Sequence, residues 1–162
     1  MSFAKKIEPY FDISAAITES VCLMLKQVSG IDPIISSYRE LQDFNLKSDV
    51  SGIINLKSDI ANDYLILSFD KKNILDFAEL IFGQRYTKID KTVSSCICEL
   101  CNMTYGVFKT KMNQAGSKYH MSLPTTSEDF KKEVATNQIQ SALTCTIELN
   151  QIRFNLILLF GK

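Results

Sequence analysis

The sequence predicts an α+β fold in which a mostly antiparallel sheet packs against long helices. Two observations predict it: strand-like segments outnumber helical ones, and consecutive strands are separated by short turns, as in hairpins. The chain has 162 residues, of which 46% are hydrophobic and 22% are charged. This length and composition predict one packed domain over residues 1–162.

Three segments have the three- and four-residue hydrophobic spacing of an amphipathic helix. The first is expected over residues 10–30, with Asp12 as its N-cap. The second is expected over residues 72–82 and the third over residues 92–115. Each is closed by a glycine, which readily adopts the left-handed backbone found at helix ends.

Four strand-like segments fall between or after these helices. Residues 31–41 are expected to be extended. Residues 50–56 and 63–69 are expected to form an antiparallel hairpin, because both are apolar and the link between them is short. A further strand is expected over residues 119–123, closed by Pro124.

The C-terminal segment has the clearest hairpin pattern. Residues 143–149 and 152–160 alternate between apolar and polar positions, and Asn150-Gln151 forms the turn. The second of these strands is apolar on both faces over residues 156–160, which predicts burial by helices or by another subunit. Residues 125–141 are polar and remain unassigned.

The charge balance limits the classes of partner. Lys and Arg number 18 and Asp and Glu number 18, so the formal net charge is zero. Nonspecific nucleic-acid binding depends on excess cations, so no nucleic-acid partner is expected. The longest apolar runs are far shorter than the roughly 20 residues needed to span a bilayer. With no pattern of a secretion signal at the N-terminus, no membrane association and a cytoplasmic location are expected.

The five cysteines do not predict a disulfide framework, because their number is odd and a secretion signal is absent. Cys96, Cys98 and Cys101 are close together, but no second cysteine pair or histidine partner follows. We therefore expect no metal site and interpret these cysteines as small packing residues. A redox or metal sensor at this cluster is a weaker alternative.

The third helix carries a stripe of small and polar residues. Ser95, Glu99, Asn102 and Gly106 are spaced four, three and four residues apart, which places them on one side of a helix. A carboxylate and a carboxamide therefore project one turn apart. Taken alone, such a pair is most simply a solvated polar face.

The same residues resemble the active-site signature of the CheC/CheX/FliY family of response-regulator phosphatases. The signature is Ser95-x-x-x-Glu99-x-x-Asn102, followed after 21 residues by Pro124. The CheX members are the most similar, and the likeness extends over nearly the whole chain. It also includes residues 9–11, 49–54, 67–69, 81–83 and 102–109.

The resemblance implies an enzyme that hydrolyses the aspartyl phosphate on the receiver domain of a CheY-like response regulator. It assigns Asn102 to orienting the attacking water and Glu99 to pairing with a lysine of the partner. Ser95 would line the entry face and Gly106 would admit the partner. Family members with two sites carry the pair on two helices, but Glu19 of the first helix is followed by Cys22 at the asparagine position, so one site is expected.

The resemblance also implies that this chain binds no cofactor of its own, because the receiver domain would bring Mg²⁺. It implies a homodimer. Lys88 and Lys91 stand where acidic residues are frequent in the family, a difference that bears on partner choice more than on chemistry. The alternative is a non-catalytic dimeric module that binds a response regulator or a flagellar partner.

Overall fold

The computed structural model describes residues 3–162, with side chains described from Ile13 onward. The seven strands are β1 (Ile34–Ile35), β2 (Arg39–Glu40), β3 (Val50–Lys57), β4 (Asn62–Phe69), β5 (Thr125–Ser127), β6 (Ile139–Leu149) and β7 (Ile152–Gly161). They form one antiparallel sheet in the order β1-β6-β7-β4-β3-β5, and β2 also pairs with β6. The expected α+β class with an antiparallel sheet is confirmed.

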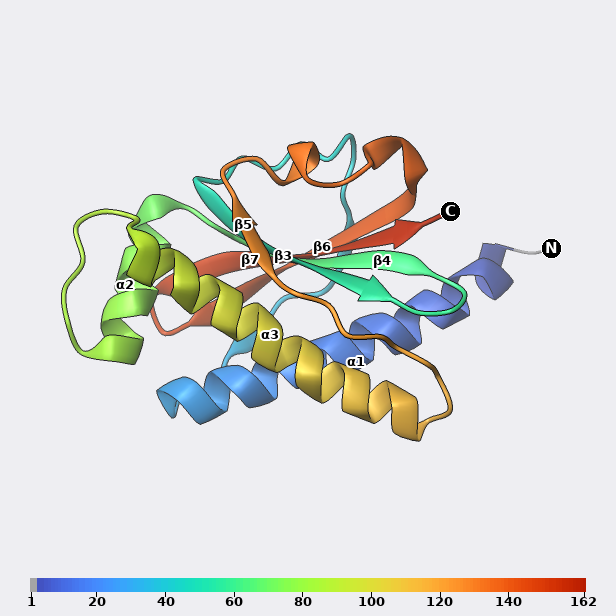
Figure 1. Ribbon diagram of the computed structural model, residues 1–162, viewed down its shortest axis with the longest axis horizontal. Coiled ribbons are helices and arrows are strands. Elements are labelled where there is room, and N and C mark those ends of the chain that lie inside the picture. The colour runs from blue at the N-terminus through green and yellow to red at the C-terminus, as the bar shows by residue number, and fades with distance from the viewer. Residues whose placement is uncertain (1–2) are drawn as a thin grey trace.

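Three α-helices cover one face of this sheet (Figure 1). They are α1 (Phe3–Ser29), α2 (Lys71–Phe82) and α3 (Lys91–Gln114). The α1 helix begins earlier than expected and continues through Pro9, so Asp12 lies inside the helix and the N-cap prediction was wrong. The error arises because proline in a sequence normally marks a helix start rather than its interior.

Both predicted hairpins are confirmed. The strands β3 and β4 pair from Val50 opposite Phe69 to Lys57 opposite Asn62. The strands β6 and β7 are joined by a turn in which Asn150 has a φ of 55°. Pairing of β4 with β7 then brings the two hairpins together at the centre of the sheet.

The prediction of a strand over residues 119–123 is wrong. Only Tyr119 forms a bridge, with Ser58, and the strand β5 starts after Pro124 and pairs with β3. Met121 and Leu123 are 80% and 82% exposed, so their apolar character does not reflect burial in the sheet. Pro124 has no backbone N–H to donate, and it precedes the paired segment rather than closing it.

The second face of the sheet is covered by the chain's own loops and 3₁₀ helices. The unassigned segment forms β5, η1 (Phe130–Lys132), η2 (Thr136–Gln138) and the start of β6. Phe130 and Val134 pack there against Ile157 and Leu159 of β7. The two-sided apolar pattern of residues 156–160 is thus explained within the chain, and no second subunit is needed to bury it.

The segment expected to be extended over residues 31–41 contains two short strands, β1 and β2, that both pair with β6. None of the helices in the described part of the chain is both long enough and apolar enough to cross a membrane.

Candidate functional site

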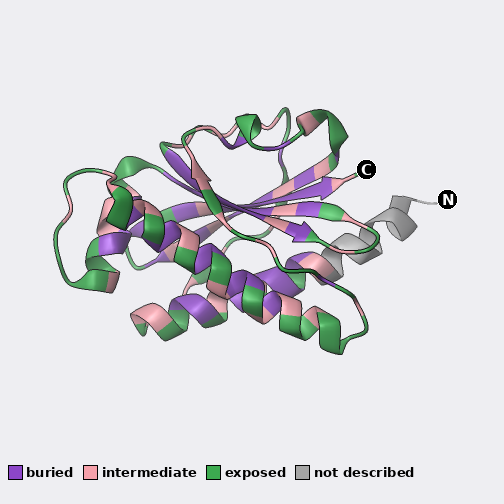
Figure 2. Cartoon of the chain, in the orientation of Figure 1, coloured by how far each residue is buried: buried purple, intermediate pink, exposed green. Residues whose placement is uncertain are grey.

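The residues of the predicted stripe share one exposed face of α3. Ser95, Glu99, Asn102 and Gly106 are all exposed, whereas Ile97 on the opposite side is fully buried. Exposed and buried positions alternate along α3 in Figure 2. The helix therefore presents a carboxylate and a carboxamide to solvent while its other face forms part of the core.

The position of α3 is set by contacts near its N-terminus and at its centre. Asp90 caps the helix, with its carboxylate accepting a hydrogen bond from the Val93 N–H at 3.0 Å. At Gly52 of β3, an added Cβ would lie 2.5 Å from Ile97 Cγ2 and 2.8 Å from Cys101 Sγ. The absence of a side chain at Gly52 lets α3 lie directly on β3, which holds the exposed stripe at a fixed height above the sheet.

The segment that follows α3 folds back along it. The Tyr105 hydroxyl donates to the His120 carbonyl, and Lys109 Nζ lies 3.4 Å from Met121 Sδ. The His120 ring contacts Asp59 on the β3–β4 turn at 2.7 Å, so it has a partner outside the stripe. Pro124 of the signature lies on this returning segment, immediately before β5, and β5 contacts α3.

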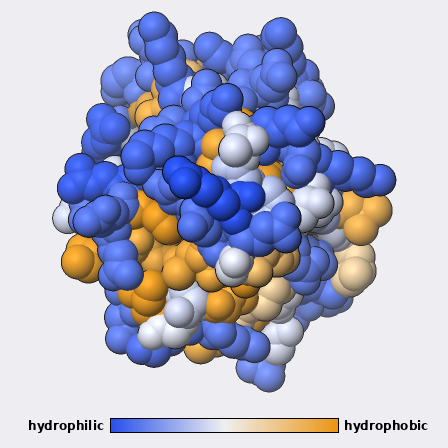
Figure 3. Space-filling model, turned by 90° about the vertical axis from the view of Figure 1, so that its left-hand side faces the viewer, coloured by the Kyte–Doolittle hydropathy of each residue, from blue (hydrophilic) through white to orange (hydrophobic). Residues whose placement is uncertain are grey.

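Glu99 lies at the edge of a small apolar cavity of about 100 Å³ between the three helices. The cavity is lined by Val28, Phe77, Ile81, Phe82, Cys96, Glu99, Leu100 and Met103. Figure 3 views this end of the molecule and shows hydrophobic side chains gathered across its lower part, beside hydrophilic ones. Within the described residues, no hydrogen bond or ion pair holds the side chains of Glu99 or Asn102, so both are free to bind a partner.

The corresponding carboxylate on α1 is already engaged. Glu19 forms an ion pair with Lys111 near the C-terminal end of α3. Cys22, three residues later, is partly buried and has a pKa raised by burial. The α1 helix therefore uses its carboxylate to hold α3 and offers no carboxamide beside it. Sequence reasoning missed this contact because the two partners are 92 residues apart.

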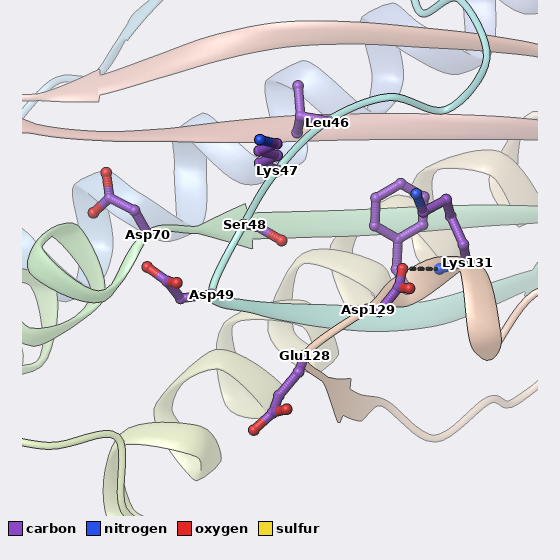
Figure 4. Close-up of a pocket in the computed structure, with 9 residues that line it drawn as sticks. Leu46, Lys47, Ser48, Asp49, Asp70, Glu128, Asp129 and Lys131 are labelled. Atoms are coloured by element: carbon purple, nitrogen blue, oxygen red, sulfur yellow. Dashed lines mark hydrogen bonds between the residues drawn. The ribbon is translucent and has the colours of Figure 1, made fainter.

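A second hollow, which neither Glu99 nor Asn102 lines, has a volume of about 490 Å³ (Figure 4). Its carboxylates include Asp49, Asp70 and Asp129. Asp49 and Asp70 accept hydrogen bonds from the backbone N–H groups of Lys71 and Asn73 at the start of α2. Asp129 accepts from the Lys131 N–H at 3.1 Å. These three carboxylates therefore accept hydrogen bonds from backbone N–H groups. None of the predicted site residues lines the hollow.

The cysteines of α3 face mainly inward. Cys96 and Cys101 are buried and Cys98 is partly buried. Burial raises the pKa of the Cys96 thiol to about 11, and it raises the pKa of Cys101 further. In the part of the chain that the structure describes, no three His, Cys, Asp or Glu side chains are grouped so as to hold a metal ion. Packing in the core accounts for Cys96 and Cys101.

The fold matches several solved structures over most of their length. A CheC-like superfamily protein from Shewanella sp. PV-4 is 19% identical, with a TM-score of 0.78, and the match covers 93% of this chain and 98% of that one. The chemotaxis protein CheX from Vibrio vulnificus is 16% identical, with a TM-score of 0.77, over 93% and 99% of the two chains. A CheX-CheY-BeF3-Mg complex from Borrelia burgdorferi is 15% identical, with a TM-score of 0.74, over 91% and 97%.

A comparison with curated protein sequences found no match. The family described as "Chemotaxis phosphatase CheX" matches residues 50–148, which include β3, β4, the whole of α3 and Pro124. This match covers more than half of the chain, and the solved structures share the fold over 91% to 93% of it. The chain therefore belongs to the CheX family of chemotaxis phosphatases.

Proposed function

We propose that this protein hydrolyses the aspartyl phosphate on the receiver domain of a CheY-like response regulator, using Glu99 and Asn102 of α3. The observation that carries the proposal is the arrangement of these two side chains. They are exposed, one helical turn apart, and without partners in the described residues, on a helix that Gly52 and Asp90 hold firmly against the sheet.

Asn102 orients the attacking water in this proposal. An aspartyl phosphate is an acyl phosphate and is already reactive, so the protein needs no nucleophile of its own. It must hold a water in line with the leaving carboxylate, and positioning of this kind supplies most of the catalysis in phosphoryl transfer. The carboxamide of Asn102 can donate one hydrogen bond to that water and accept another from it, which fixes its direction.

Glu99 docks the partner in this proposal. Its carboxylate would pair with a lysine beside the phosphorylated aspartate and set the register of α3 against the receiver domain. The apolar cavity beside Glu99 limits solvent access from one side, which strengthens such a pair. Ser95 would line the approach one turn earlier, and Gly106 would allow the partner's backbone close to the helix because no side chain projects there.

No cofactor bound by this chain enters the proposal. Mg²⁺ would come with the receiver domain and would neutralise charge on the transferring phosphoryl group. The solved complex of a Borrelia CheX with CheY, beryllofluoride and Mg²⁺ supports a CheY-like receiver as the partner. A chain that acts on such regulators would work in the cytoplasm.

The test follows phosphate loss from a phosphorylated receiver domain with and without the protein. Asn102→Ala should slow the accelerated dephosphorylation by about 10²-fold or more, by analogy with losing one group that positions the reaction. Asn137→Ala, at an exposed asparagine in η2, is the matched control and should leave the rate unchanged. An Asn102→Ala variant as active as the wild type would exclude this role. Binding without any acceleration by the wild type would instead establish the non-catalytic module.

We also propose a homodimer, formed along the edge of the sheet at β5. This edge strand covers only Ser51, Gly52 and Ile53 of β3, and the exposed side chains of Met121 and Leu123 lie just before it. Exposed apolar side chains beside an incompletely paired strand favour association. Sedimentation analysis should show a dimer that Leu123→Lys weakens, and a wild-type monomer at all concentrations would exclude it.

A further inference from the structure

Three cations mark the approach to α3 from its N-terminal side. Arg85 and Lys88 lie on the loop between α2 and α3, and Lys91 is the first residue of α3. All three are exposed, and none of them takes part in the ion pairs formed by the described residues. In a chain of zero net charge, this is a local excess of positive charge beside the proposed site.

No carboxylate of the described residues forms an ion pair with these cations. Asp90 accepts from the Val93 N–H, and Asp76 is paired with Lys72 at 2.6 Å. Glu79 of α2 is exposed and is the remaining acidic group on the neighbouring helix. From Gly83 to Glu99 the chain carries three cations against two carboxylates, Asp90 and Glu99, so a local excess of positive charge remains.

Lys91 continues the line of the site residues. It precedes Ser95 by four positions and Glu99 by eight, so the three residues share one side of α3. At a rise of about 1.5 Å per residue, Lys91 lies about 12 Å from Glu99 along the helix axis. A folded partner bound at Glu99 and Asn102 would therefore extend over Lys91.

Helix stability does not account for Lys91. The N-terminus of a helix carries the positive end of its dipole and favours acidic side chains, yet the first turn of α3 contains a lysine and no acidic residue. Arg85 and Lys88 form no side-chain hydrogen bond or ion pair that would hold the loop within the described structure. The three side chains are therefore unengaged within the described structure and available to a partner.

The adjoining apolar surface supplies the other half of an interface. Phe82 is 49% exposed, borders the cavity at Glu99, and packs its ring edge against Tyr86 with centroids 6.1 Å apart. Protein interfaces commonly have an apolar and aromatic centre with a charged rim. Phe82 and the cavity form such an apolar centre, and the three cations follow Phe82 on the loop and at the start of α3. Figure 3 shows hydrophobic areas beside hydrophilic ones at this end of the molecule.

We infer that Arg85, Lys88 and Lys91 select the receiver domain by its charge: the partner carries acidic side chains on the face beside its phosphorylated aspartate and an apolar side chain that meets Phe82. This inference rests on the proposed function for the class of partner. The cations act on encounter and affinity rather than on the reacting phosphoryl group, because Lys91 lies about 12 Å from Glu99 along the helix axis and the other two precede it on the loop.

The experiment measures binding of a CheY-like receiver domain activated with beryllofluoride and Mg²⁺, so that no hydrolysis is required. The triple charge reversal Arg85→Glu/Lys88→Glu/Lys91→Glu should weaken binding by about tenfold or more at low salt, and the difference should shrink at high salt. The matched control is Lys57→Glu/Lys118→Glu/Lys132→Glu, which reverses three exposed cations elsewhere on the surface and should change binding less than about twofold.

A folding defect would be recognised separately. Glutamate at position 91 suits a helix N-terminus, so the thermal midpoint of the triple variant should not fall. Equal binding by the wild type and the triple variant, equal weakening by both triples, or a change in self-association in place of receiver binding would each overturn the inference. So would a wild type that binds no activated receiver.

The outcomes separate this inference from the proposed function. Salt-dependent binding that the triple reversal weakens, with no phosphate hydrolysis by the wild type, would retain the docking surface and reject the enzyme. Normal hydrolysis with binding unaffected by the reversal would retain the enzyme and reject the docking surface. If the phosphatase activity and the docking surface are both correct, the triple variant should have a KM for the phosphorylated receiver about tenfold higher and an unchanged kcat. Asn102→Ala should instead lower kcat.

Discussion

The helices α1 and α3 lie beside each other on the same face of the sheet, and each carries one exposed glutamate near the middle of its length. On α1, Glu19 is paired with Lys111 of α3, and the position three residues later is a partly buried cysteine. On α3, Glu99 has no partner within the described residues, and the position three residues later is the exposed Asn102. Glu19 and Glu99 are therefore both exposed glutamates, but only Glu19 is engaged by a partner within the described residues.

The difference teaches that two exposed carboxylates on neighbouring helices differ in whether the fold itself supplies their partner. Glu19 holds two helices together, and its partner is supplied within the chain. Glu99 faces solvent at the rim of an apolar cavity, so any partner must come from outside. The α3 helix is also the more closely seated of the two, because Gly52 lets it contact β3 directly.

The matched pair Glu99→Gln and Glu19→Gln tests this comparison most strongly. Glu99→Gln should lower kcat/KM for a phosphorylated receiver by about 10- to 100-fold, mainly through KM, because it removes a charge that pairs with the partner. Glu19→Gln should leave kcat/KM unchanged and lower the free energy of unfolding by about 0.2–1 kcal/mol, as expected for an exposed ion pair. Equal losses of activity in the two variants would contradict the assignment.

Gly52→Ala tests the close seating of α3. The added Cβ would lie 2.5 Å from Ile97 and 2.8 Å from Cys101, so the helix must move away from β3. We expect a loss of about 1–3 kcal/mol in the free energy of unfolding, measured by chemical denaturation. If stability is unchanged, the helix is not held by this approach, and its stripe is free to shift.

The buried thiols predict a decline in stability at alkaline pH. Burial raises the pKa of Cys96 on α3 to about 11 and that of Cys145 on β6 to about 11, above the ordinary thiol value. The native state then binds more protons than the unfolded state, so this stabilisation is complete below about pH 8.5 and is lost as pH rises toward 11.

Denaturation at a series of pH values measures that decline. Cys96→Ala should remove part of it, because the variant no longer has the α3 thiol that ionises on unfolding. Cys22 and Cys98 are less buried than Cys96 and should react with a thiol reagent before it under native conditions. A pH-independent unfolding free energy between pH 8 and 11 would contradict the burial of these thiols.

Gly106→Ala tests whether the glycine lets the partner approach α3, and it has the smallest expected effect. Apart from the adjoining residues and backbone of its own helix, no atom lies within 4 Å of a Cβ added at Gly106, so alanine should stabilise α3 by about 0.8–1 kcal/mol. If the partner's backbone approaches this position, the same variant should raise KM for the receiver severalfold. A more stable protein with unchanged KM would remove Gly106 from the docking surface while leaving Glu99 and Asn102 in place.

Part of the fold was accessible from local patterns. The hairpin β3–β4 was predicted because both segments are apolar and the link between them is short, and β6–β7 because apolar and polar residues alternate on either side of a two-residue turn. The stripe on α3 was placed on one exposed side by its spacing alone. The start of α1 was missed because proline is disfavoured inside a helix, so a helix continuing through Pro9 was not expected. The strand over residues 119–123 was mispredicted because the sequence does not distinguish the exposed Met121 and Leu123 from buried apolar residues.

The antiparallel sheet and the positions of Ser95, Glu99, Asn102 and Gly106 on one helix side follow from short-range periodicity and residue spacing, which depend only on neighbouring residues. The family was indicated by the resemblance of these residues and Pro124 to a known signature. Three other features needed the tertiary structure: the pairing of Glu19 with Lys111, the approach of α3 to Gly52, and the burial of residues 156–160 by the segment around Phe130. Each joins residues far apart in the chain. Which glutamate is free and which is engaged is decided by how the chain packs, because the partner that neutralises a charge is fixed by position in space rather than by order in sequence.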